Sequence, residues 1–211
     1  MQRAISPFVV LLMMLVFPPL SNADSIKILA FGDSLTAGYG LKEHEAFPVR
    51  LEKALTANGH DVTVINSGQS GDTTGAGLAR VDWALFDKPD AVILELGAND
   101  MLRGLPVSST KENLSKIITL FQAQSLPILL TGMLASESYG SEYKTEFDAV
   151  FPELAAEKKL MLYPFFLEGV AGNISLNQED GIHPTAEGVD VIVSAILPTL
   201  EKFIKSSAIK P

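Results

Sequence analysis

Five short apolar runs recur along the chain, and longer segments with helical spacing lie between and after them. The runs cover residues 26–31, 61–66, 91–96, 127–133 and 160–166. The segments with helical spacing cover residues 46–59, 74–87, 109–124, 143–159 and 186–205. Strands that alternate with helices form a parallel sheet with helices on both faces. The sequence therefore predicts an α/β fold with a five-stranded parallel sheet, a break or bend at Pro152 and a kink near Pro198.

Polar, glycine-containing segments follow four of the five apolar runs. They are GDSLT (32–36), NSGQSGDTT (66–74), GANDMLRG (97–104) and EDGIHPT (179–185). In an open parallel sheet, ligands bind beyond the carboxyl ends of the strands. These four segments are therefore expected to meet at one rim of the sheet and to form the functional site there.

Ser34 is a candidate nucleophile, although a serine after a strand can equally be a helix cap or a turn residue. A serine nucleophile needs a base, and His183 is the best placed of the three histidines. Pro184 biases its backbone to an extended conformation, and Asp180 stands three residues earlier, close enough to fold back onto the ring. We expect a solvated role for His44 and a cap or turn role for His60.

Stabilisation of an oxyanion needs N–H donors, and the rim segments contain three candidates. Gly71 can bring its backbone N–H close to a substrate, Asn99 carries a side-chain amide, and Ser34 has its own backbone N–H. Ordinary turn chemistry for Gly71 and a helix cap or Asx-turn for Asn99 remain alternatives.

The four segments GDSL (32–35), SGDTT (70–74), GAND (97–100) and DGIHP (180–184) resemble, in order, the four sequence blocks of the SGNH hydrolases, also called GDSL lipases or esterases. The resemblance implies a flavodoxin-like three-layer α/β/α sandwich with no metal and no cofactor. It also implies Ser34 as nucleophile, His183 as base, Asp180 as its partner, and an oxyanion hole of Ser34, Gly71 and Asn99. The implied activity is hydrolysis of acyl esters and thioesters (lysophospholipids, acyl-CoA and aryl esters) through an acyl-enzyme on Ser34.

The apolar segments MLRGLPV (101–107) and PFFLEGV (164–170) favour a pocket for an acyl chain, although a core would use the same residue types. The first resembles a mobile loop that covers the acyl chain in related enzymes, so Leu102 and Leu105 are expected to bind substrate. Tyr139, in the stretch 133–140, is a further candidate for substrate binding. The stretch MLASESYG (133–140) departs from relatives, which commonly have a proline pair and an asparagine there. That departure leaves the preferred chain length open.

Two other functions remain as alternatives, namely a carbohydrate O-acetylesterase of the same fold and a catalytically inactive exported binding protein. Other classes lack their patterns. GQSGD (68–72) misses the G-x-S-x-G of α/β-hydrolases. GAGLAR (75–80) has Arg80 in place of the last glycine of a dinucleotide-binding motif, and zinc ligands at the usual spacing are absent.

The N-terminal segment resembles a bacterial export signal, with Arg3, an apolar run over residues 8–17 and small residues before a cleavage point after Ala23. Residues 24–211 then form a single domain, without a stable membrane span, in the periplasm or the medium. An uncleaved membrane anchor is the alternative. The formal net charge is −9, with no dense Lys/Arg cluster and no cysteine, so we expect no nucleic-acid partner and no disulfide. We expect a monomer that acts on a small acyl ester or thioester.

Overall fold

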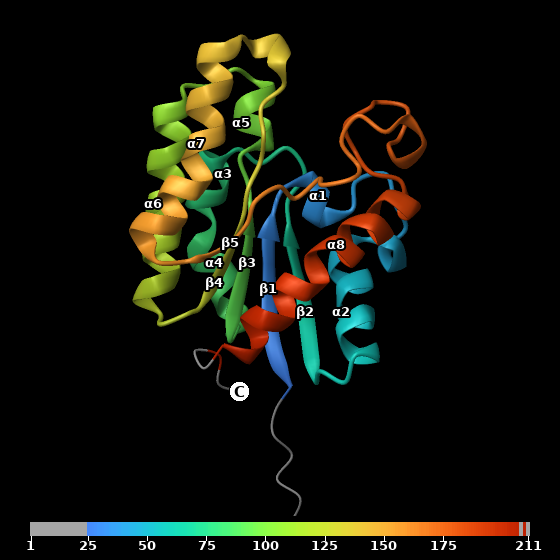
Figure 1. The fold of residues 1–211 in the computed structure, drawn as a ribbon. Helices are drawn as coiled ribbons and strands as arrows, with labels where there is room; N and C mark the ends of the chain where they lie inside the picture. Colours follow the sequence, from blue (N-terminus) through green and yellow to red (C-terminus); the bar gives the residue numbers. More distant parts are fainter. Residues whose placement is uncertain (1–24, 207–208, 210–211) are drawn as a thin grey trace, which may run out of the picture.

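The computed structural model describes residues 25–206 and Ile209, and its centre is a five-stranded sheet. All strand pairs are parallel, and the order across the sheet is β2-β1-β3-β4-β5 (Figure 1). The strands are β1 (Ile26–Gly32), β2 (Val62–Gly68), β3 (Ala91–Glu95), β4 (Ile128–Thr131) and β5 (Met161–Tyr163). This is the flavodoxin-like order, so the predicted sheet is confirmed.

Helices cover both faces of the sheet and make three layers. α2 and α8 pack together on one face, whereas α3, α4, α6 and α7 lie on the other (Figure 1). The helices are α1 (Ser34–Ala37), α2 (Phe47–Ala57), α3 (Thr74–Ala79), α4 (Val81–Ala84), α5 (Ala98–Leu102), α6 (Val107–Ala123), α7 (Ser141–Lys158) and α8 (Ala186–Lys205). Short 3-10 turns occupy Glu43–Glu45, Leu85–Asp87, Glu137–Tyr139 and Ile174–Leu176.

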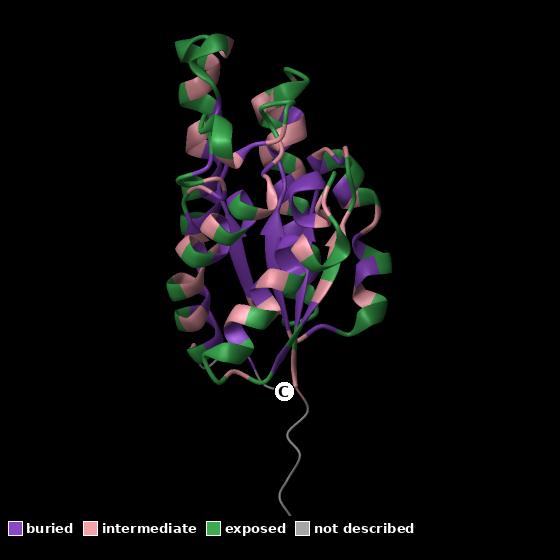
Figure 2. Ribbon diagram, turned by 90° about the vertical axis from the view of Figure 1, so that its right-hand side faces the viewer, coloured by how far each residue is buried: buried purple, intermediate pink, exposed green. Residues whose placement is uncertain are grey.

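The apolar strands are buried because helices cover them from both sides. All five residues of β3 are buried, and Figure 2 shows the buried residues concentrated in the sheet and on the inner sides of the helices. Aromatic pairs join the layers. Phe31 of β1 meets Phe121 of α6 with ring centroids 5.4 Å apart, and Phe47 of α2 meets Phe166 at 5.0 Å. Each fully buried side chain of this size contributes about 1.5–3 kcal/mol of transfer free energy.

Two helices differ from their predicted forms. The predicted helix over 74–87 is interrupted at Arg80, whose backbone leaves helical geometry (φ −118°, ψ 8°) between α3 and α4. The helix does not break at Pro152, since α7 is one helix through that residue, and the alternative of a bend there stays a prediction. α8 is also one helix through Pro198, and the kink expected near that residue stays a prediction. Phe147, Phe151 and other buried side chains hold α7 on the sheet, and this packing outweighs the local cost of a proline.

Two short helices lie in the polar segments that follow β1 and β3. α1 begins directly after β1 and α5 lies shortly after β3, at the carboxyl end of the sheet (Figure 1). The residues 101–107 are therefore not a continuous loop, because α5 includes Met101 and Leu102 and α6 already begins at Val107. Both short helices carry residues of the functional site.

Among the described residues, no helix combines the length and the apolar character that a membrane span needs. The predicted export signal and its cleavage point lie outside the described residues.

Candidate active site

The strand order changes direction at β1, and the candidate site lies at this point. The chain passes from β1 to β2 on one side and then to β3 on the other, so the loops after β1 and β3 leave the sheet in opposite directions. Such a switch point leaves a crevice beyond the carboxyl ends of the strands. Ser34 follows β1, and Asn99 lies in α5 just after β3, so both lie at the crevice.

A continuous hydrogen-bonded chain joins Ser34, His183 and Asp180. The Ser34 Oγ lies 2.9 Å from the His183 Nε2, and the Nδ1 of the same ring lies 2.6 Å from the Asp180 Oδ2. Ser34 and His183 are 149 residues apart in the sequence, so only the fold brings them together. The arrangement can move a proton from a serine hydroxyl to an imidazole whose other nitrogen a carboxylate holds.

Asp180 also fixes the loop that carries His183. Its Oδ1 accepts hydrogen bonds from the backbone N–H groups of Ile182 (2.9 Å) and His183 (3.0 Å). These N–H groups and the His183 ring lower the pKa of Asp180 to about 2, so the carboxylate stays charged across the physiological range. The ring of Tyr39 packs on the imidazole, with centroids 4.5 Å apart, and limits where the ring can turn.

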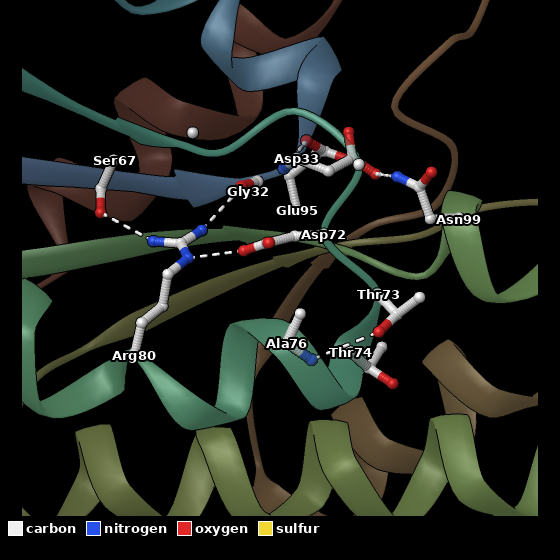
Figure 3. Close-up of polar contacts among 12 residues, drawn as sticks. Gly32, Asp33, Ser67, Asp72, Thr73, Thr74, Ala76, Arg80, Glu95 and Asn99 are labelled. Carbon is white, nitrogen blue, oxygen red and sulfur yellow. Dashed lines mark hydrogen bonds and ion pairs between the residues drawn. The ribbon is translucent and has the colours of Figure 1, made fainter.

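Asp33 shapes the turn that presents Ser34. It caps α1 by accepting the Leu35 N–H on its Oδ1 at 3.0 Å, and its Oδ2 accepts the Asn99 Nδ2 at 3.0 Å (Figure 3). An amide nitrogen has two hydrogens, so this contact holds the Asn99 side chain and leaves its second N–H for another acceptor. Asp33 thus ties the loop after β1 to α5.

Two backbone N–H groups at the carboxyl edge of the sheet have no acceptor among the described residues. Among the described residues, neither the Ser34 N–H nor the Gly71 N–H donates a hydrogen bond. Gly71 has a φ of +86°, in the left-handed region that favours glycine. Arg103 donates to the Gly71 carbonyl at 2.7 Å and helps to fix that peptide.

A second carboxyl group lies beneath the turn. Glu95, at the end of β3, is fully buried, and its Oε2 accepts the Thr36 hydroxyl (2.8 Å) and the Asp33 N–H (3.3 Å). Its Oε1 has no hydrogen-bond partner among the described residues. Burial, and then the nearby charge of Asp33, raise the pKa of Glu95 well above its ordinary value, and burial raises the pKa of Asp33 to about 6. Gly32 is a glycine because a Cβ there would collide with Thr36 and Glu95.

Asp100 anchors the same region from the other side. Its carboxylate accepts the Thr74 N–H at 2.8 Å, the Thr74 hydroxyl at 2.5 Å and the Thr110 hydroxyl at 3.2 Å. It therefore joins α5 to the first turns of α3 and α6, next to Asn99.

A cleft of about 490 Å³ opens at Ser34 and His183. This volume lies within the range of small-molecule sites. Its apolar wall includes Met101, Leu102, Met133, Phe165, Leu167 and Ile182.

Not every residue expected to bind substrate lies at the cleft. Leu102 lines it, but Leu105 and Tyr139 do not. Tyr139 lines a separate surface hollow beside α7, and its hydroxyl reaches back to the Leu102 carbonyl at 3.4 Å. The first four residues of the stretch 133–140 also line the cleft, and Ser136 is the one among them that stands where relatives commonly differ, whereas Glu137 and Ser138 do not line it.

The other histidines have separate contacts. His44 is largely exposed beside Glu45, and His60 lies 3.6 Å from Glu201. Within the described part of the chain, no group of three His, Cys, Asp or Glu side chains has a geometry that could hold a metal ion.

Comparison with known proteins decides the family. Residues 30–191 match the model of the GDSL-like Lipase/Acylhydrolase family. The chain belongs to this family. It is 40% identical over 197 residues to an arylesterase of Vibrio mimicus, with 92% of this chain and 98% of the relative covered. It is 35% identical over 183 residues to the thioesterase 1/protease 1/lysophospholipase L1 of Escherichia coli K12, covering 86% of each. The crystal structure of AlinE4, an SGNH-hydrolase family esterase, is 47% identical, with a TM-score of 0.74 over 88% of this chain and all of that one.

The family establishes the reaction class, and the chain is a serine ester hydrolase with an SGNH fold. Three residues beneath the site, Asp72, Arg80 and Glu95, were not predicted from the sequence, and the role of Asp33 extends beyond the turn before Ser34 to its contact with Asn99. Asp33 and Glu95 stand beside a predicted strand end, which is a signal for them. Arg80 is a single residue in a helical pattern, and nothing in that pattern points to the rim of the sheet.

Proposed function

We propose that this enzyme hydrolyses acyl esters and thioesters through an acyl-enzyme on Ser34. The observation that carries the proposal is the chain of hydrogen bonds from Asp180 through His183 to Ser34, at the mouth of a largely apolar cleft. Ser34 is the nucleophile in this proposal, His183 is the general base and acid, and Asp180 holds the ring in one orientation.

The reaction follows from these positions. The Ser34 Oγ attacks the carbonyl carbon while its proton passes to the His183 Nε2, and the carbonyl oxygen becomes an oxyanion. The N–H groups of Ser34 and Gly71 and the free N–H of Asn99 stabilise that charge. The tetrahedral intermediate then expels the alcohol or thiol, which takes the proton from His183. A water molecule repeats both steps on the acyl-enzyme and releases the carboxylic acid.

The cleft favours substrates with an apolar acyl group. Leucine, methionine and phenylalanine side chains form its wall, and the relatives are named arylesterase and thioesterase 1/protease 1/lysophospholipase L1. We therefore propose aryl esters, acyl-CoA and lysophospholipids as substrates, in preference to acetylated carbohydrate. We also propose that the chain is exported to the periplasm or the medium after cleavage at Ala23, and that it acts as a monomer.

The test is the Ser34→Ala substitution together with a fluorophosphonate probe. The variant should fold normally and lose nearly all ester hydrolysis, keeping a residual catalysis of about 10³–10⁴ over water. The probe should label the unaltered enzyme at Ser34 and not the variant, as mass spectrometry of the labelled peptide would show. Turnover near that of the unaltered enzyme in a folded Ser34→Ala variant would overturn the proposal.

A further inference from the structure

Arg80 makes an unusual set of contacts beneath the active site. Its Nε donates to the Asp72 Oδ2 at 2.6 Å, its Nη2 to the Gly32 carbonyl at 2.8 Å, and its Nη1 to the Ser67 Oγ at 3.2 Å (Figure 3). The guanidinium also lies 4.0 Å from the centroid of the Phe31 ring. Every nitrogen of the side chain therefore has a partner, and the break between α3 and α4 falls at this residue.

These partners belong to the two segments that carry the unpaired N–H groups. Gly32 ends β1 and stands two residues before Ser34, whereas Asp72 directly follows Gly71. The Gly32 carbonyl also accepts the Gln69 N–H at 3.0 Å, so the start of the second segment is tied to the same atom. The Arg80 guanidinium therefore joins the residue that follows Gly71 to the end of β1, in addition to the backbone bond from Gln69 and the Arg103 contact with the Gly71 carbonyl.

We propose that Arg80 is a positioning residue for the oxyanion hole, because it sets the separation of the Ser34 and Gly71 N–H groups. The inference rests on the function proposed above, in which both N–H groups bind the oxyanion. Arg80 does not line the cleft, so it acts through Gly32 and Asp72 and not on the substrate.

Arginine is suited to this position for two reasons. Its planar fork offers donors in fixed directions, whereas a lysine ammonium is a single point charge on a flexible stem. In addition, the Arg80 and Asp72 side chains are only 22% and 11% exposed, so water screens their ion pair less than it screens a surface pair. Loss of the guanidinium would leave the Asp72 carboxylate buried without its charged partner, and its movement toward water would carry Gly71 with it.

The consequence for catalysis is specific. Negative charge on the carbonyl oxygen develops in the transition state, so a misplaced donor lowers kcat more than it raises KM. Loss of one oxyanion donor costs about 10²–10³ in rate, and a displaced donor should cost part of that. The His183–Asp180 pair makes no contact with Arg80. The way in which kcat/KM falls toward acidic pH should therefore be the same in an Arg80 variant as in the unaltered enzyme.

The experiment compares Arg80→Met with Arg50→Met. Arg50 is a matched control, because it also binds a carboxylate (Asp190, 3.1 Å) and a backbone carbonyl (His44, 3.0 Å) and is 26% exposed, but its contacts lie outside the cleft. We expect kcat to fall at least about tenfold in Arg80→Met with KM within about twofold, and both constants to stay within about twofold in Arg50→Met. Affinity for a trifluoromethyl ketone, which forms a tetrahedral adduct, should fall in parallel with kcat/KM, whereas affinity for the fatty acid product should not.

Two further variants keep the test decisive. Arg80→Lys retains the positive charge but lacks the planar guanidinium. It should therefore be more thermally stable than Arg80→Met, while its kcat should stay as low. If Arg80→Met does not fold, Asp72→Asn replaces it in the test. That variant should also lower kcat, because it weakens the same ion pair.

The results that would overturn the inference are plain. They are an unchanged kcat in Arg80→Met, a change in KM alone, or an equal loss of kcat in Arg50→Met. If kcat is unchanged in Arg80→Met while Ser34→Ala is inactive, only the role of Arg80 is refuted and the proposed function stands. An active, folded Ser34→Ala enzyme would instead remove the proposed function on which the role of Arg80 rests.

Discussion

At the scale of single residues, three carboxyl groups lie near Ser34, and the proposed reaction uses only one of them. Asp180 holds His183. Asp33 and Glu95 belong instead to the turn that presents Ser34, and both are buried. Asp33 has donors for both oxygens, from Leu35 and Asn99, which favour its charged form. Glu95 has one oxygen without a partner among the described residues, and burial raises the pKa of its carboxyl group well above its ordinary value, which favours the protonated form.

A proton retained by Glu95 makes stability depend on pH. In the unfolded chain this carboxyl group loses its proton above about pH 4, whereas the folded protein keeps the proton to a higher pH. The folded state therefore binds more protons in that window, and the free energy of unfolding falls as pH rises through it, by up to about 1.4 kcal/mol per pH unit. Glu95→Gln has no such proton, so its free energy of unfolding should not fall in this way. The advantage in unfolding free energy that the unaltered protein has over the variant should therefore shrink as pH rises. Urea denaturation between pH 5 and pH 8 measures it.

Glu112→Gln is the control for this prediction. Glu112 is exposed and its pKa is lowered by Lys116, so its removal should leave the slope above pH 5 unchanged. Parallel stability curves for Glu95→Gln and the unaltered protein would show that Glu95 is ionised in the folded state. The Gln amide would also bury a donor without an acceptor, which lowers the stability of the variant by the same amount at every pH, so only the change of the difference with pH tests the prediction.

At the scale of elements, the sequence predicts the features that depend on the local pattern of apolar and polar residues. The strands follow from apolar runs, and Ser34, Asp180 and His183 follow from polar segments at strand ends, because parallel strands bring those ends to one rim. The break between α3 and α4 has no local signal, since it falls where Arg80 reaches across to β1 and β2. The same limit explains Leu105, because α5 and α6 divide the segment 101–107 and leave its side chain away from the cleft.

Leu102 and Leu105 form a matched pair for testing the cleft. Leu102 lines it, whereas Leu105 does not and its carbonyl accepts the Tyr143 hydroxyl at 3.2 Å. Each added CH₂ that is buried contributes at most about 0.8 kcal/mol, or about fourfold in kcat/KM. We expect Leu102→Ala to flatten the rise of kcat/KM with acyl length and Leu105→Ala to leave it unchanged, measured with p-nitrophenyl esters from acetyl to dodecanoyl. Equal effects of both substitutions would contradict the assignment of the cleft, and a flat profile in the unaltered enzyme would favour the carbohydrate acetylesterase.

At the scale of the whole molecule, charge is the property that no single site explains. The chain has 25 acidic and 16 basic side chains, which give a formal net charge of −9. Removal of the first 23 residues would delete one positive charge, that of Arg3, and leave −10. A net charge of this size creates a repulsive field for anions that extends over about 10 Å at 0.1 M salt. The proposed substrates differ in charge, since acyl-CoA carries several phosphate charges and an aryl ester carries none.

This difference predicts a salt dependence that separates the two substrates. Added salt screens the repulsion and speeds the encounter, so kcat/KM for acyl-CoA should rise several-fold between low and high ionic strength. For the p-nitrophenyl ester with the same acyl group it should stay constant, which controls for effects of salt on the enzyme itself. A fall in kcat/KM for acyl-CoA would contradict the prediction and indicate a local cation that binds the phosphates. Arg103 would then be the first residue to substitute, because it follows α5, whose residues Asn99 and Leu102 line the cleft, and its guanidinium contacts the Gly71 carbonyl.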